Sequence, residues 1–80
     1  MNLQTAPIYE IAKYIYQNWK NVSPYAEPYL RAMTNIDSIN DNYFNDSASS
    51  VVLYFLSNAI GWRGDVAREV KAELRSRLGM

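Results

Sequence analysis

The sequence contains no cysteine and no histidine among its 80 residues. Without cysteine, neither a disulfide framework nor a thiolate metal site can form. Without histidine, the chain lacks the commonest general base and the commonest side-chain metal ligand. A nucleophilic serine needs an activating base, and the carboxylates and lysines show no spacing typical of such a pair. We therefore expect no enzymatic activity, no cofactor and no metal site.

The chain also lacks a long apolar run and an excess of charge. No run reaches the roughly 20 apolar residues that cross a bilayer, and no basic segment precedes an apolar one at the start. We expect a soluble, cytoplasmic protein with no membrane contact. The net charge is zero, with three basic and five acidic residues up to Asp46, and five basic and three acidic residues after it. This mild dipole is not typical of nucleic-acid binding.

Aromatic residues, in contrast, are plentiful, with seven Tyr, two Trp and two Phe. A chain of this length buries only about 60% of its unfolded surface, so its core depends on large apolar side chains. The aromatic residues supply that bulk. We predict one domain over residues 1–80, with residues 1–5 as a loose arm.

The segment from Ser50 to Ile60 is the most apolar in the chain, and it reads as a strand or a helix by composition alone. A strand would need a sheet covered on both faces, and no second run of that kind exists. As a helix, the segment has one wide apolar stripe. The residues at both ends of the segment also fit a helix. Asp46 or Ser47 can cap the first turn, and Gly61 can adopt the left-handed conformation after the last turn.

Three further helices are predicted around this central one. The first runs from Pro7 to near Asn21, and the second from Pro24 or Tyr25 to Thr34, with Pro28 either inside it or in its first turn. The last begins at Asp65, which we expect to cap it, and ends near Leu78. The predicted fold is therefore all-α, a compact bundle of about four helices with a central buried helix.

The stretch from Asn35 to Asp46 is the most polar part of the chain and predicts a loop, with at most one short helical turn. We expect apolar side chains to pin it to the core, namely Ile36, Ile39, Tyr43 and Phe44. Its carboxylates suggest a calcium loop, but Ile39 occupies a ligand position, the central glycine is missing and Ala48 replaces the terminal glutamate. A solvated connector and a recognition loop both remain open.

Trp62 and Arg63 lie between Gly61 and Gly64, at the corner before the last helix. We predict that Trp62 fills this corner and that Arg63 is exposed as a contact for a phosphate, a carboxylate or a partner protein. Two helices joined by a short turn also have the dimensions of a helix-turn-helix DNA-binding motif. In that alternative the last helix enters the major groove, and four basic side chains lie near phosphates or base edges, namely Arg63, Arg68, Lys71 and Arg75. Two acidic residues, Asp65 and Glu69, lie at the end of the helix where groups that contact bases and phosphates are needed. They and the zero net charge argue against DNA binding.

A set of short motifs runs along the chain, namely Trp19-Lys20, Pro28-Tyr29-Leu30, Ala32-Met33, Asp37-Ser38-Ile39-Asn40-Asp41, Tyr43, Asp46-Ser47, Val51-Val52, Tyr54-Phe55-Leu56, Asn58-Ala59, Trp62-Arg63-Gly64, Ala67-Arg68 and Lys71-Ala72-Glu73-Leu74. Together they resemble a group of small uncharacterised proteins carried by bacterial phages, plasmids and conjugative elements. The likeness covers about residues 11–78, and glycine is usual in the group where this chain has Phe44. The resemblance implies an accessory protein of a mobile element that binds a host component, such as a defence complex.

The sequence thus favours a non-enzymatic protein-binding module with counter-defence activity as its most concrete form. The predicted binding face combines the polar loop, the corner and the exposed side of the last helix, and its residues are Asp37, Asp41, Tyr43, Arg63, Arg68 and Lys71. The first alternative is a small helix-turn-helix DNA-binding protein. The second is a homodimer that pairs through the aromatic first helix, which carries Tyr9, Tyr14, Tyr16 and Trp19.

Overall fold

Four helices and one small hairpin make up the computed structural model, which describes all residues 1–80. Their order is α1 (Ile8–Asn18), α2 (Glu27–Met33), β1 (Asn42–Tyr43), β2 (Asp46–Ser47), α3 (Ala48–Ser57) and α4 (Asp65–Arg77). The two short strands pair antiparallel, with Asn42 opposite Ser47 and Tyr43 opposite Asp46. A single domain with four helices is thus confirmed, but the fold is not strictly all-α because the polar loop forms a hairpin.

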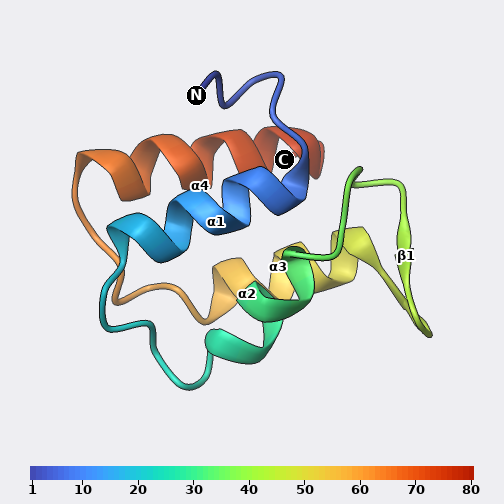
Figure 1. Ribbon diagram of the computed structural model, residues 1–80, viewed down its shortest axis with the longest axis horizontal. Helices are drawn as coiled ribbons and strands as arrows, with labels where there is room; N and C mark the ends of the chain where they lie inside the picture. The colour runs from blue at the N-terminus through green and yellow to red at the C-terminus, as the bar shows by residue number, and fades with distance from the viewer.

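The helices form two layers (Figure 1). Helices α1 and α4 lie side by side and run in opposite directions, while α2 packs against α3 beneath them. The hairpin extends from the start of α3, at one end of the molecule, and the turn between α3 and α4 lies at the other end. This arrangement separates the polar loop from the corner that carries Arg63.

The interior is entirely apolar: 21 residues are buried and none of them is polar or charged. The buried faces of the four helices account for most of it, including Ile8, Ile11, Ala12 and Ile15 from α1 and Ala67, Val70 and Leu74 from α4. None of the four helices has the length and apolar composition that a bilayer-spanning helix requires.

Two tryptophans close one end of this core. The rings of Trp19 and Trp62 stack at a centroid distance of 5.7 Å. The rings of Trp19 and Phe55 meet edge to face, with their centroids 6.3 Å apart. Trp19 follows α1, Trp62 follows α3, and both are buried. The prediction that Trp62 fills the corner is confirmed. Aromatic pairs of this kind stabilise a fold by about 0.5–1.5 kcal/mol beyond their area burial.

The helix ends only partly match their predictions. The Ser47 hydroxyl accepts a hydrogen bond from the Ser50 N–H at 3.1 Å, so the cap of α3 is confirmed. Gly61 does not adopt the predicted left-handed conformation; Gly64 does, at φ 112°, where it precedes α4. Asp65 does not cap α4 through its side chain, because its carboxylate pairs with Arg68 instead.

The central helix is less enclosed than expected. Helix α3 buries Ala48, Val51, Val52, Phe55 and Leu56. Its opposite flank reaches solvent, however, since Leu53 is 41% and Tyr54 51% exposed. The Tyr54 ring lies 5.6 Å from the Tyr29 ring of α2, which covers only part of that flank. A helix surrounded on every side is therefore not confirmed.

The first five residues make hydrogen bonds to their neighbours and to α4. The carbonyl of Asn2 accepts hydrogen bonds from the N–H groups of Thr5 and Ala6 at 3.2 and 3.0 Å. The Arg77 guanidinium donates to the carbonyl of Leu3 at 2.6 Å and to the Glu73 carboxylate at 2.8 Å. Arg77 thus joins the N-terminal residues to α4 while it pairs with Glu73 on the same helix.

We predict that Trp62→Ala lowers the free energy of unfolding by about 3 kcal/mol or more, because it removes a buried ring and leaves a cavity beside Trp19. Urea denaturation measures this change. Tyr25→Ala is the matched control, since Tyr25 is 75% exposed and its removal should change stability by about 0.5 kcal/mol or less. Equal effects of the two substitutions would contradict a structural role for the stacked tryptophans.

Candidate functional site

The hairpin is held in place by Asp41. Its carboxylate accepts hydrogen bonds from the backbone N–H groups of Asp37 and Ser38 at 3.2 and 2.9 Å. Its carbonyl accepts the N–H of Ala48 at 2.8 Å. Asp41 therefore joins the start of the loop to the first residue of α3, and its carboxylate is used within the molecule.

Asp37 serves the fold through its backbone and leaves its side chain in solvent. Its carbonyl accepts the N–H of Ile8 at 2.9 Å, which fixes the loop to the first residue of α1. Its carboxylate is exposed and makes no hydrogen bond or ion pair, and the same is true of Asp46 in β2. Together they give the hairpin end two free negative charges.

The tip of the hairpin displays Phe44, a residue that sequence reasoning placed against the core. Its side chain is 86% exposed, and its backbone lies at φ 55°, the one left-handed residue in the chain that is not glycine. Tyr43 is half-buried against the core, and its ring meets the Phe44 ring edge to face at 4.7 Å. The prediction that Phe44 pins the loop is wrong because the turn directs it outward.

At the other end of the molecule, Lys71 fastens α4 to the preceding corner. Its ammonium group donates hydrogen bonds to the carbonyls of Ala59 and Trp62 at 2.7 and 2.6 Å. Burial is the main cause that lowers the pKa of Lys71, and repulsion by Arg75 and Arg63 adds to it. Lys71 is thus partly a structural residue, which the sequence alone did not reveal.

The other predicted residues of this end are exposed arginines. Arg68 forms an ion pair with Asp65, and its side chain is 76% exposed. Arg63 is exposed, as predicted, and neither Arg63 nor Arg75 pairs with a carboxylate. The four basic residues of the helix-turn-helix hypothesis are therefore not equivalent, since only Arg63 and Arg75 are free of any internal partner.

The predicted residues do not form one surface. Asp37, Asp41 and Tyr43 lie with the hairpin, while Arg63, Arg68 and Lys71 lie at or beyond the α3–α4 corner (Figure 1). The two groups are separated along α3, whose ten residues span about 15 Å at 1.5 Å per residue. We call the first group the hairpin end. The name basic corner is used for Arg63, Lys71 and Arg75, the basic residues of the turn and α4 that form no ion pair.

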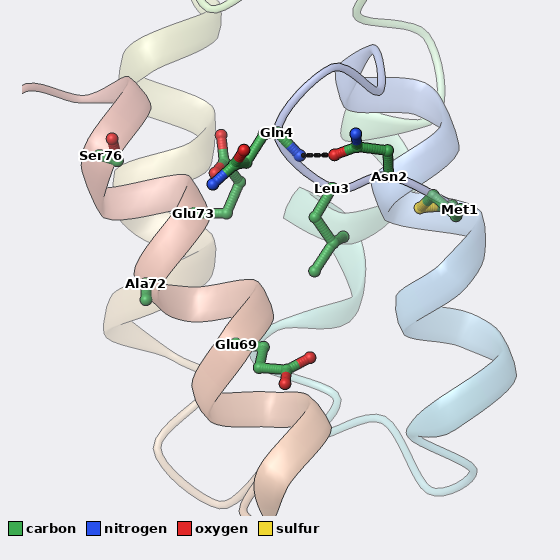
Figure 2. Close-up of a pocket in the computed structure, with 8 residues that line it drawn as sticks. All are labelled: Met1, Asn2, Leu3, Gln4, Glu69, Ala72, Glu73 and Ser76. Carbon is green, nitrogen blue, oxygen red and sulfur yellow. Dashed lines mark hydrogen bonds between the residues drawn. The ribbon is translucent and has the colours of Figure 1, made fainter.

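A hollow in the surface lies elsewhere, between the N-terminal residues and α4 (Figure 2). It is an open groove of about 720 Å³, lined by Met1, Asn2, Leu3, Gln4, Glu69, Ala72, Glu73 and Ser76. Glu73 is already paired with Arg77, and Gln4 donates its N–H to the Asn2 side chain. Glu69 is the remaining charged side chain of this groove, and it forms no ion pair. One carboxylate does not indicate which class of ligand the groove binds.

The homodimer hypothesis requires that the aromatic residues of α1, and Trp19 directly after it, are available to a second chain. Several of them instead make contacts within the fold. Trp19 is buried and Tyr14 is packed against the core. Tyr16 donates its hydroxyl to Glu27, which also pairs with Arg31. Burial, followed by this bond and the charge of Glu27, raises the pKa of Tyr16 to about 12. Pairing through this helix stays a prediction.

Comparison of the chain with protein-family models, with curated proteins and with solved structures gives no match. The resemblance to small proteins of mobile elements therefore stays a prediction. The function has to be argued from the hairpin end and the basic corner.

We predict that Lys71→Ala lowers the free energy of unfolding by about 1 to 2 kcal/mol, because it removes two hydrogen bonds from a charged donor. Arg75→Ala is the matched control on the same helix, and its removal should change stability by about 0.5 kcal/mol or less. Thermal unfolding of both variants measures the difference. Equal stability of the Lys71→Ala and Arg75→Ala variants would show that the two hydrogen bonds of Lys71 do not stabilise the fold.

Tyr16 provides a test by pH. Its pKa rises from 10.0 to about 12, so the fold favours the neutral phenol. This contribution to stability is complete below pH 10 and is lost as the pH rises through about 12. We expect Tyr16→Phe to remove the component of the tyrosinate absorbance titration that is centred near pH 12. Loss of a component near pH 10 instead would show that the bond to Glu27 is absent in solution.

Proposed function

We propose that this protein is a non-enzymatic protein-binding module whose hairpin end contacts the partner through Phe44. One observation carries the proposal: Phe44 is 86% exposed and has the left-handed backbone conformation that favours glycine. A residue other than glycine in this conformation raises the free energy of the folded chain by about 1 to 2 kcal/mol. The exposed ring gains little for the fold in return.

Strained residues of this kind cluster at binding sites, where the surrounding structure holds them in place. The hairpin end has the necessary support. Asp41 fixes the loop through two N–H bonds, and the half-buried Tyr43 lies directly behind the Phe44 ring. The ring is therefore presented in one position, which reduces the entropy lost when a partner binds it.

The surroundings of Phe44 define the chemistry of the partner. An exposed phenylalanine is best buried in an apolar pocket, as for the aromatic anchors of other protein interfaces. Asp46 lies in the adjoining strand and Asp37 lies at the start of the loop, both with free carboxylates. The partner surface that suits the hairpin end is thus an apolar pocket with a positively charged rim.

The most concrete form of this function is counter-defence, in which the module binds and inhibits a host defence complex on behalf of a mobile genetic element. The support for that form is the resemblance in sequence described above. The support for protein binding itself is the geometry of Phe44, and it does not depend on that resemblance.

Helix-turn-helix DNA binding remains the second candidate, and the exposed, unpaired Arg63 and Arg75 favour it. Lys71 and Arg68 add less to it, because each already has a partner within the chain. A phosphate-binding protein of this kind loses affinity steeply as the salt concentration rises. The fluorescence anisotropy of a labelled DNA duplex, measured between about 50 and 200 mM salt, distinguishes the two candidates. DNA binding should weaken steeply over that range, whereas protein binding should depend on Phe44.

We predict that Phe44→Gly keeps or raises the stability of the fold by up to about 1 kcal/mol, because glycine adopts the left-handed conformation without strain. The same substitution should abolish capture of a partner protein from a bacterial host lysate. Thermal unfolding measures the first effect, and affinity capture with the tagged, full-length chain measures the second.

Tyr25→Ser is the matched control for this experiment. Tyr25 is the other aromatic side chain that is at least three-quarters exposed, at 75%, and it precedes α2 rather than the hairpin. Its removal should leave capture unchanged. If Phe44→Gly captures the same protein as the unmodified chain, or if both variants lose it equally, Phe44 is not the contact residue.

A further inference from the structure

Three cations meet at the basic corner. Lys71 donates to the Trp62 carbonyl at 2.6 Å, and Arg63 is the next residue after Trp62. Arg75 lies one turn beyond Lys71 on the same face of α4. Both Arg63 and Arg75 lie close enough to Lys71 to repel its charge. Arg63, Lys71 and Arg75 therefore form one cluster, which extends from the corner along α4 to its last turn.

No carboxylate of the chain neutralises this cluster. The three ion pairs of the molecule use Arg31, Arg68 and Arg77. Glu69 and Glu73 of α4 differ from Lys71 by two residues, which places them on the opposite side of the helix, and they line the groove beside the N-terminal residues (Figure 2). The repulsion of Lys71 by Arg75 and Arg63 is consistent with an uncompensated positive field.

Lys71 is positioned to contribute to binding as well as to the fold. An ammonium group has three N–H donors, and the carbonyls of Ala59 and Trp62 take two of them. These bonds also hold the long side chain in one place, which removes most of the entropy loss that binding by a free lysine entails. One N–H is left for a ligand, and the exposed Arg63 and Arg75 lie close enough to repel the Lys71 charge.

We propose that the basic corner binds carboxylate groups of an acidic protein segment through Arg63, Lys71 and Arg75. Guanidinium groups match carboxylates in a two-bond geometry, and a fixed lysine between them suits the same acceptor. A nucleic acid fits less well, because three cations on a chain of zero net charge give a weak phosphate-binding term. The unpaired field of the corner is relieved when a carboxylate binds.

The turn that carries Arg63 lies at the opposite end of the molecule from the hairpin that carries Phe44 (Figure 1). This site shares no residue with the hairpin end, so it does not rest on the function proposed there. The two proposals therefore fail separately. Substitution of Phe44 should leave binding at the basic corner unchanged, and neutralisation of the corner should leave the hairpin contact intact.

The test is a titration of the full-length, ¹⁵N-labelled protein with a hexaglutamate peptide at constant ionic strength, followed by NMR. We expect saturable shifts at Arg63, Lys71 and Arg75, and no saturable shifts with hexaglutamine. Arg63→Gln and Arg75→Gln should each raise the Kd about tenfold, as expected for the loss of one charge-assisted bond. Arg31→Gln removes the same charge from α2 and should change the Kd less than about twofold.

Three results would overturn the proposal. The first is the absence of saturable shifts at the corner. The second is an equal loss of affinity in Arg31→Gln, which would show that net charge alone attracts the peptide. The third is tighter binding of a short DNA duplex by the same three residues, which would assign the corner to nucleic acid.

Discussion

The stacked pair of Trp19 and Trp62 is the contact on which the rest of the structure depends. Trp19 is the residue after α1, and Trp62 lies between α3 and α4, so one aromatic stack fixes the ends of three helices. Once Trp62 is buried, its carbonyl is held where Lys71 can reach it. The neighbouring Arg63 lies in solvent. Packing of one ring thus determines the position of the positive charges around it.

Hydrophobic periodicity predicts the helices of this chain well, because each helix covers an entirely apolar core. The stripe of α4 and the Ser47 cap of α3 can both be read from local sequence. The hairpin cannot be read in this way, since its strands have two residues each and contain Asn and Asp, which are rare in strands. Its geometry comes from the Asp41 contacts with Asp37, Ser38 and Ala48, which join segments that have no shared periodicity.

The sites were predictable only in part for the same reason. The exposure of Arg63 can be predicted from the sequence, because Arg63 is a charged residue in a short corner bounded by two glycines. The role of Lys71 as a donor to Ala59 and Trp62 depends on how α4 packs against the corner, which a sequence pattern does not contain. Phe44 gives a local signal in retrospect, because it occupies the turn position after a tyrosine where glycine is the favoured residue.

An entirely apolar interior leaves all the polar chemistry of the molecule at its surface, and the two sites proposed on that surface have opposite sign. Asp37 and Asp46, which have free carboxylates, lie in the same loop and hairpin as Phe44, whereas the other site consists of Arg63, Lys71 and Arg75. One partner patch cannot match both, because a rim that attracts the first repels the second. Either two partners, or two oppositely charged parts of one large partner, therefore have to be engaged if both sites bind. Sequences depart from local rules mainly at functional sites, and the left-handed Phe44 and the unneutralised corner are two such departures.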